Sequence, residues 1–198
     1  MSLEEQFNKL SSKEPSPEDV RAFIDATRNN DKATVENYLS KFPGRIVNAK
    51  DRDGHYALLM ATIQGHTGIV SLLLEKGAAL DMVNNAGHSA LIGATIKGDK
   101  DLVALLLQKG AGLDAKNNFN GYTALMWAKS CGHGDIAMQI QAVSEQRQLA
   151  KQEAEDAQRE EIRRRELREA AASVHEGLKE DMDAAPPLRF IKKGPSAP

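Results

Sequence analysis

Two similar segments of thirty-three residues follow each other directly, and this repetition constrains the fold more than any other feature of the chain. Residues 51–83 and 84–116 have the same length and the same pattern of glycines and apolar residues. The matched positions are Gly54 with Gly87, Leu58 with Leu91, Gly65 with Gly98, and Leu72–Leu74 with Leu105–Leu107. A fixed period of this length is typical of a stack of supersecondary units, none of which can bury its apolar face alone.

Each repeat has the pattern of two short helices. Gly87 is followed by SALIGATI, which is long enough for one helix of about two turns. Gly98 is expected to end this helix, because glycine adopts the left-handed conformation without a side-chain clash. Asp99 then stands where an N-cap acceptor is needed, and LVALLL supplies a second, more apolar helix. The sequence therefore predicts an all-α fold.

These positions resemble the ankyrin repeat, whose pattern is G-x-T-P-L-H-x-A, followed by G-H, I-V-x-L-L-L and G-A. The resemblance implies a solenoid of helix–turn–helix units, joined by hairpin-like loops, that acts as a protein-binding surface. The chain departs from the pattern at Thr-Pro-Leu-His, where it has Tyr56–Leu59, Ser89–Ile92 and Thr123–Met126. Because the proline is lost each time, we expect the same fold with a softer stack. Ser89 and Thr123 can still cap their helices, whereas Tyr56 cannot do so in the same way.

The repeats predict a solenoid domain at residues 16–144, preceded by a flexible arm at 1–15. Its four expected units are 17–50, 51–83, 84–116 and 117–144. Ser16 and the proline after it predict the start of the first helix. In the last unit Gln139 and Gln141 replace two core leucines, so we expect the final outer face to be polar, as at the end of a stack.

Packing between the units also has a predicted feature. Met60, Gly93 and Trp127 occupy equivalent positions on successive inner helices. We therefore expect Gly93 to leave room for Trp127, since facing layers need large and small side chains to alternate.

Composition changes sharply after the repeats. Residues 145–198 hold 11 Lys or Arg and 12 Asp or Glu, and we expect a charged helix at 145–183 followed by a disordered tail at 184–198. The spacing favours ion pairs along the helix, each worth a few tenths of a kcal/mol: Glu155–Arg159, Glu160–Arg164 and Glu161–Arg165. The apolar positions keep no heptad, so a coiled coil is a weaker alternative to a solvated helix. Residues 189–193 (RFIKK) are either a short docking motif or plain tail.

Charge and cysteine content exclude several classes of protein. The net charge of −2 provides no general basic field for nucleic acid or for an acidic membrane. The lone Cys131 excludes an internal disulfide framework. The first residues do not resemble a secretory signal, and no window is apolar enough to span a membrane. We therefore expect a cytoplasmic protein, monomeric unless the charged helix mediates an oligomer.

No set of residues has the pattern of a catalytic or metal site. His66 and His133 follow the glycines that end inner helices, where the resemblance implies a structural role. His55 and His88 lie one repeat apart, which is not a metal-ligand spacing. Cys131 is better interpreted as a passive thiol, and no phosphate-binding or dinucleotide-binding motif is present. We expect no enzyme, no metal site and no cofactor.

What remains is a surface for a protein partner. By resemblance, partners contact the loop tips and the exposed side of the inner helices. The candidate residues are Arg52, Asp53, His55, Gln64, Asn85, His88, Lys97, Phe119, Asn120, Tyr122 and Ser130. His55, His88 and Tyr122 are expected to form a column, and Phe119 and Tyr122 are candidate anchors without a core role; the alternative is that all of these are ordinary surface residues.

The predicted function is therefore that of a protein–protein interaction module, an adaptor or regulator. The alternative is an effector or an enzyme-associated subunit, in which the repeats target an activity carried by the tail or by a bound partner.

Overall fold

The computed structural model describes residues 14–184, with side chains as far as residue 172. The predicted N-terminal arm, up to residue 13, lies outside the described residues. Residues 185–198, which hold almost all of the predicted tail and the motif at 189–193, lie outside them as well. The chain divides between Gln146 and Arg147 into two units, and each is described by itself.

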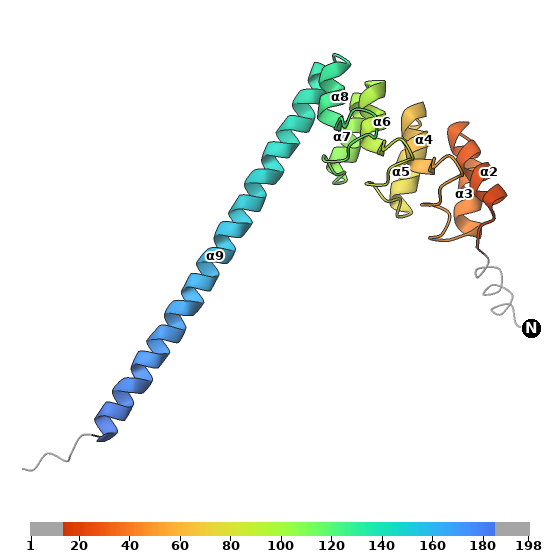
Figure 1. Ribbon diagram of the computed structural model, residues 1–198. Coiled ribbons are helices and arrows are strands. Elements are labelled where there is room, and N and C mark those ends of the chain that lie inside the picture. Colours follow the sequence, from red (N-terminus) through yellow and green to blue (C-terminus); the bar gives the residue numbers. More distant parts are fainter. Residues whose placement is uncertain (1–13, 185–198) are drawn as a thin grey trace, which may run out of the picture. The chain divides into compact units, whose positions relative to one another are not determined.

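The first unit is a row of helix pairs (Figure 1). Its helices are α2 (Pro17–Arg28), α3 (Lys32–Lys41), α4 (Ala57–Gln64), α5 (Thr67–Glu75), α6 (Ala90–Lys97), α7 (Lys100–Gln108), α8 (Ala124–Ser130) and the first turns of α9 (Gly134–Ala184). The inner helices α2, α4, α6 and α8 pack on one another in chain order, and α3, α5 and α7 each pack on their own inner helix. The predicted all-α solenoid is confirmed, and no strand occurs within residues 14–184.

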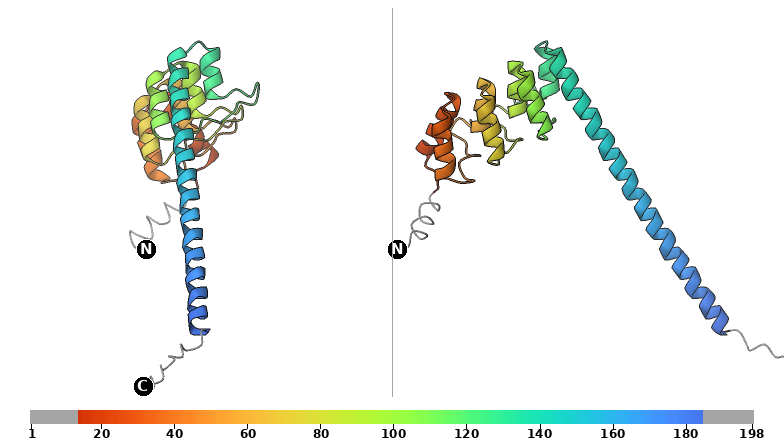
Figure 2. Two further views of the ribbon diagram at one scale, coloured as in Figure 1. Left: turned by 90° about the vertical axis from the view of Figure 1, so that its left-hand side faces the viewer. Right: turned by 180° about the vertical axis from the view of Figure 1, so that it is seen from behind.

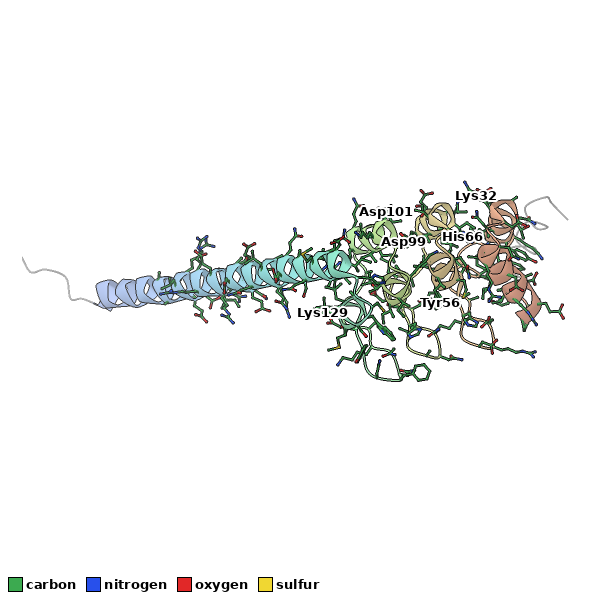
Figure 3. All side chains as sticks on the ribbon, turned by 90° about the horizontal axis from the view of Figure 1, so that it is seen from above. Lys32, Tyr56, His66, Asp99, Asp101 and Lys129 are labelled. Atoms are coloured by element: carbon green, nitrogen blue, oxygen red, sulfur yellow. The ribbon has the colours of Figure 1, made fainter. Side chains whose placement is uncertain are left out.

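The loops before the inner helices all project on one side of the stack (Figure 2, left). Seen from above in Figure 3, Tyr56 and Lys129 lie toward the loop side. Lys32 and Asp101 lie on the opposite side, where the outer helices run. The inner helices and the loops thus share one face of this unit.

Most predicted helix starts carry the expected cap. The side chains that accept a hydrogen bond from the first turn are those of Ser16, Ser89, Asp99 and Thr123. Tyr56 makes no cap bond, as expected. Its buried hydroxyl instead donates to the carbonyl oxygen of Met82 at 2.5 Å, so this side chain ties its own repeat to the start of the next loop.

Helices α4 and α6 end as the sequence predicts. Gly65 and Gly98 are their C-caps and have φ values of 83° and 77°. This left-handed conformation favours glycine, because any other side chain would be strained there.

Buried threonines mark the same position on three inner helices. The hydroxyls of Thr27, Thr62 and Thr95 each donate to the carbonyl oxygen four residues earlier, at 2.7–2.8 Å. Such a bond satisfies a polar group inside an apolar core. The equivalent residue on α8 is Lys129, and it is exposed. The pattern therefore stops at the last inner helix.

Gly93 does not make room for Trp127, so that expectation is wrong. A Cβ at Gly93 would lie 3.0 Å from Leu59 Cδ1 and 3.2 Å from Ile63 Cγ1, both on the preceding helix α4. Trp127 is half-buried and packs against the rings of Tyr122 and His88. Equivalent positions on successive helices therefore do not face each other directly, and this offset cannot be recognised from matched sequence positions alone.

The two glutamines of the last helix pair lie on either side of one core residue. Ile140 is buried in the core, where the earlier units have the middle leucine of their run. Gln141 is exposed and donates to Glu145 Oε1 at 3.0 Å, whereas Gln139 is half-buried. The two glutamines thus replace the leucines on either side of the central one and leave the central apolar contact in place.

The second unit is the remainder of α9, and it is helical as far as Ala184. The described side chains from Gln148 to Ala172 are all exposed. Leu149 and Leu167 lie on one line, five turns apart, while Ile162 lies about 140° around the helix from both. These residues therefore form no continuous apolar seam.

One of the three predicted ion pairs on this helix is present. Arg164 contacts Glu160 at 2.7 Å. The other observed pairs are Arg165 with Glu169, Arg159 with Asp156, and Lys151 with Glu155. Arg159, Arg164 and Arg165 each have two acidic residues three or four positions away, so spacing alone does not select one partner. None of the helices in the described part is both long and apolar enough to cross a membrane.

Candidate partner-binding surface

Three loops close with the same hydrogen bonds, which makes their tips equivalent. The loop-closing pairs are Asp51 with His55, Asn84 with His88, and Asn117 with Tyr122. In each pair the first residue donates its backbone N–H to the carbonyl oxygen of the second, at 3.0–3.1 Å. The side-chain oxygen of the first residue also accepts the backbone N–H of the second, at 2.8–2.9 Å. His55, His88 and Tyr122 therefore occupy one structural position, as the sequence predicts.

Neighbouring loops are also bonded to each other. Lys50 Nζ donates to the carbonyl oxygen of Val83 at 2.6 Å, and Asn118 Nδ2 donates to that of Asn85 at 2.8 Å. A Cβ at Gly87 would lie 2.7 Å from the carbonyl oxygen of Lys116, so the backbones approach closely there. The loop tips form a connected row rather than three independent loops.

Phe119 is the most exposed aromatic side chain in this row, at 82%. It lies in the loop that is one residue longer than its counterpart in the preceding repeat. The other candidate residues that are exposed are Arg52, Asp53, Gln64, Asn85, Lys97, Asn120 and Ser130. Large aromatic side chains are enriched among the residues that dominate binding at protein interfaces.

Tyr122 has a packing role, contrary to expectation. It is half-buried, and its ring meets that of Trp127 edge-on at 5.6 Å between centroids. Tyr122 thus supports the loop that carries Phe119. The sequence could not show this, because the neighbour lies on α8 and depends on how the loop folds back.

The two histidines of the row differ in their surroundings. His55 Nδ1 lies 3.1 Å from Asp51 Oδ2. The loop-closing partner of His88 is the neutral Asn84 instead, and the His88 ring meets that of Trp127 edge-on at 6.3 Å. His88 Nε2 is buried without a hydrogen-bond partner in the described part of the chain. Burial lowers the pKa of His88 from its ordinary value and so favours the neutral form of its ring, which lies against Trp127.

Asp51, Asp53 and His55 bring three potential metal-ligand atoms within 4.8 Å of one another. The loop itself explains this grouping. Asp51 Oδ1 accepts the backbone N–H groups of Asp53 and His55, at 3.0 and 2.8 Å, and Asp51 Oδ2 faces the His55 ring. The carboxylate of Asp51 is therefore engaged in closing the turn.

The candidates at the other end of the inner helices form a separate group. Gln64, Lys97 and Ser130 lie seven or eight residues beyond the loops, about 12 Å along the helix axis. His66 Nε2 lies 3.0 Å from the carbonyl oxygen of Arg28, which fits the structural role expected for it. The loop row and the helix ends are thus distinct parts of the predicted surface.

A comparison with protein families agrees with this geometry. The family model that matches the chain describes ankyrin repeats (3 copies), and it covers residues 23–117. Residues 23–117 belong to the ankyrin-repeat family. This ankyrin-repeat segment runs from the middle of α2 through α7, while α8 and α9 lie beyond it. No curated protein matches the chain. Ankyrin repeats are generic protein–protein interaction modules and are typically non-catalytic.

Proposed function

We propose that the ankyrin-repeat stack is a non-catalytic adaptor or regulator that binds a protein partner through its loop row, with Phe119 as the anchor. The loop row comprises the tips of the three equivalent loops: the exposed Arg52, Asp53, Asn85, Phe119 and Asn120, and the half-buried His55, His88 and Tyr122. The partner is a cytoplasmic protein, and the stack binds it as a monomer.

The exposure of Phe119 carries this proposal. Large aromatic side chains are enriched among the residues that dominate binding free energy. An aromatic ring left in water at the tip of a loop has no packing role in its own chain. Phe119 is exposed while Tyr122 and Trp127, close to it in sequence, are half-buried. Its exposure is therefore a feature of this side chain and not of the whole loop.

The rigidity of the row supports the same proposal. Binding is weakened by the entropy lost when a flexible loop becomes ordered. The contacts of Asn118 with Asn85, and of Lys50 with Val83, hold the tips in place before any partner arrives. The ring of Tyr122 fixes the base of the last loop against Trp127. A row ordered in this way loses little further entropy on binding.

Photo-cross-linking tests the proposal. The photoreactive amino acid p-benzoylphenylalanine replaces Phe119 in one variant and Met138 in a matched variant. Met138 is also exposed and apolar, but it lies on α9 and not in a loop. We expect a protein adduct from position 119 and none of the same mass from position 138. Equal adducts from both positions, or none from position 119, contradict binding at the loop row.

A further inference from the structure

The last helix pair leaves exposed a surface whose equivalent in each earlier repeat is covered by the next repeat. The loop glycines show this first. A Cβ at Gly54 would meet Asn85 of the next loop, and a Cβ at Gly87 would meet Asn117 and Asn118. A Cβ at Gly121 has no atom within 4 Å. The loop glycines Gly54 and Gly87 thus each lie against the next loop, whereas Gly121 has no next loop against it.

The far ends of the inner helices show the same change. A Cβ at Gly65 would meet Lys97 of the next repeat, and a Cβ at Gly98 would lie 2.7 Å from the ring of His133. Nothing lies within 4 Å of a Cβ at Gly132. The two glycine series are independent, and both stop after α8.

The helix surface between these glycines is apolar and exposed. Leu59 on α4 and Ile92 on α6 are both fully buried. Met126, the equivalent residue on α8, is 50% exposed. We call the open surface the end face, and it comprises Gly121, Leu125, Met126, Lys129 and Gly132. Its centre has the chemistry of a repeat interface without the repeat that would cover it.

Charge indicates what would cover the end face. Lys129 replaces the threonine that is buried on the three earlier inner helices. It lies three residues after Met126, so the two side chains share one side of α8. Residues 115–134 contain Lys116 and Lys129 but no aspartate or glutamate. An occupant of this surface therefore meets positive charge beside an apolar centre.

We propose that the end face binds an acidic amphipathic helix of another protein, in the place where the inner helix of a further repeat would lie. A helix fits because each earlier inner helix is covered by the next inner helix. Its apolar side packs on Met126 and Leu125, and a carboxylate pairs with Lys129. A second copy of this chain fits less well, because a two-fold contact would bring Lys129 close to its own equivalent.

The structure also indicates the shape of that helix. Gly93 on α6 lies against Leu59 and Ile63 of α4. Met126 and Ser130 stand at the equivalent positions on α8. The bound helix should therefore carry glycine or alanine opposite Met126, with apolar residues one turn to either side. This site is separate from the loop row, and the proposed function does not depend on it.

Selection of peptides tests the end face. The probe is a phage-displayed library of random helical peptides of about four turns, selected on the full chain. We expect the selected peptides to be acidic and amphipathic. Their affinity should fall at least about tenfold for Met126→Glu and for Lys129→Glu, and it should also weaken as salt rises from low to high concentration. The matched variants Met138→Glu and Lys109→Glu change exposed residues outside the end face, and they should leave the affinity within about twofold.

Three results would overturn the proposal. The first is a selection that returns no binder above background, or binders without net negative charge. The second is binding that Phe119→Ala abolishes and that Met126→Glu and Lys129→Glu leave unchanged, which would keep the loop row and reject the end face. The third is self-association of the full chain in sedimentation that Met126→Glu reverses, since a second copy would then be the occupant. Thermal melts of each variant, and of the milder Lys129→Gln, check that the fold is retained.

Discussion

Leu59 fills the space that a side chain at Gly93 would need. A Cβ at Gly93 would lie 3.0 Å from Leu59 Cδ1, closer than ordinary van der Waals contact. Leu59 is fully buried on α4, and Gly93 is buried on the neighbouring helix α6. The two residues form a large-to-small contact between consecutive inner helices, and this contact sets how closely α4 and α6 approach.

Replacing Gly93 with leucine should therefore destabilise the stack. We expect Gly93→Leu to lower the free energy of unfolding by about 1–3 kcal/mol through overpacking, despite the better helix propensity of leucine. Urea denaturation of Gly93→Leu, Leu59→Ala and the variant that carries both changes measures the coupling free energy between the two positions. The double variant should be less destabilised than the sum of the two single changes. Additivity within about 0.5 kcal/mol would show that the two side chains do not compete for space.

The Tyr56 hydroxyl should contribute to stability through its bond to Met82. Tyr56→Phe leaves the ring in the core and removes the donor, so we expect a loss of about 1 kcal/mol in the free energy of unfolding. Tyr38→Phe is the matched control, because Tyr38 is half-buried and its hydroxyl bonds to no described residue. Urea midpoints that shift equally in both variants would contradict a specific role for this bond.

Phe119 and Tyr122 should differ in their effect on stability. Phe119→Ala should change the free energy of unfolding by less than about 0.5 kcal/mol, because the side chain is exposed. Tyr122→Ala should cost about 1 kcal/mol, since it removes the edge-on contact with Trp127. Thermal melts followed by Trp127 fluorescence compare the two. The same melting temperature in both variants would place Tyr122 outside the packed structure.

His88 should make the stack sensitive to mild acid. Its pKa is lowered by burial, so the unfolded chain binds this proton more readily than the folded chain does. The stability that neutral His88 contributes is complete above the ordinary pKa of 6.5 and decreases as the pH falls below it. Urea midpoints at pH 7.5 and 5.5 should therefore differ less in His88→Gln than in the wild type. An equal difference in both proteins would exclude His88 as the source.

The repeat pattern predicted features that depend on local sequence. The caps at Ser16 and Asp99 and the left-handed Gly98 follow from residues within one turn of each helix end. The equivalence of His55, His88 and Tyr122 follows from the loop glycine that directly precedes each of them. Local preference and tertiary structure agree at these positions, so they can be recognised without the fold.

Features that depend on contacts between repeats were not predictable in the same way. Gly93 meets Leu59 and Ile63 instead of Trp127, because successive inner helices are offset. The burial of Tyr122 depends on a loop that folds back onto α8. The exposure of Met126 was predictable from the sequence, since no further copy of the repeat follows Gly132.

The most direct test of binding through the loop row is an affinity measurement with a purified partner, which is first identified by its cross-link to position 119. The affinity of this partner is measured for three forms of the full chain: the wild type, Phe119→Ala and the matched Met138→Ala. If Phe119 is the anchor, Phe119→Ala should weaken binding by about 2 kcal/mol or more, which is roughly thirtyfold in Kd. Met138→Ala should leave the Kd within about twofold. An unchanged Kd for Phe119→Ala, with its melting temperature equal to that of the wild type, would contradict binding at the loop row.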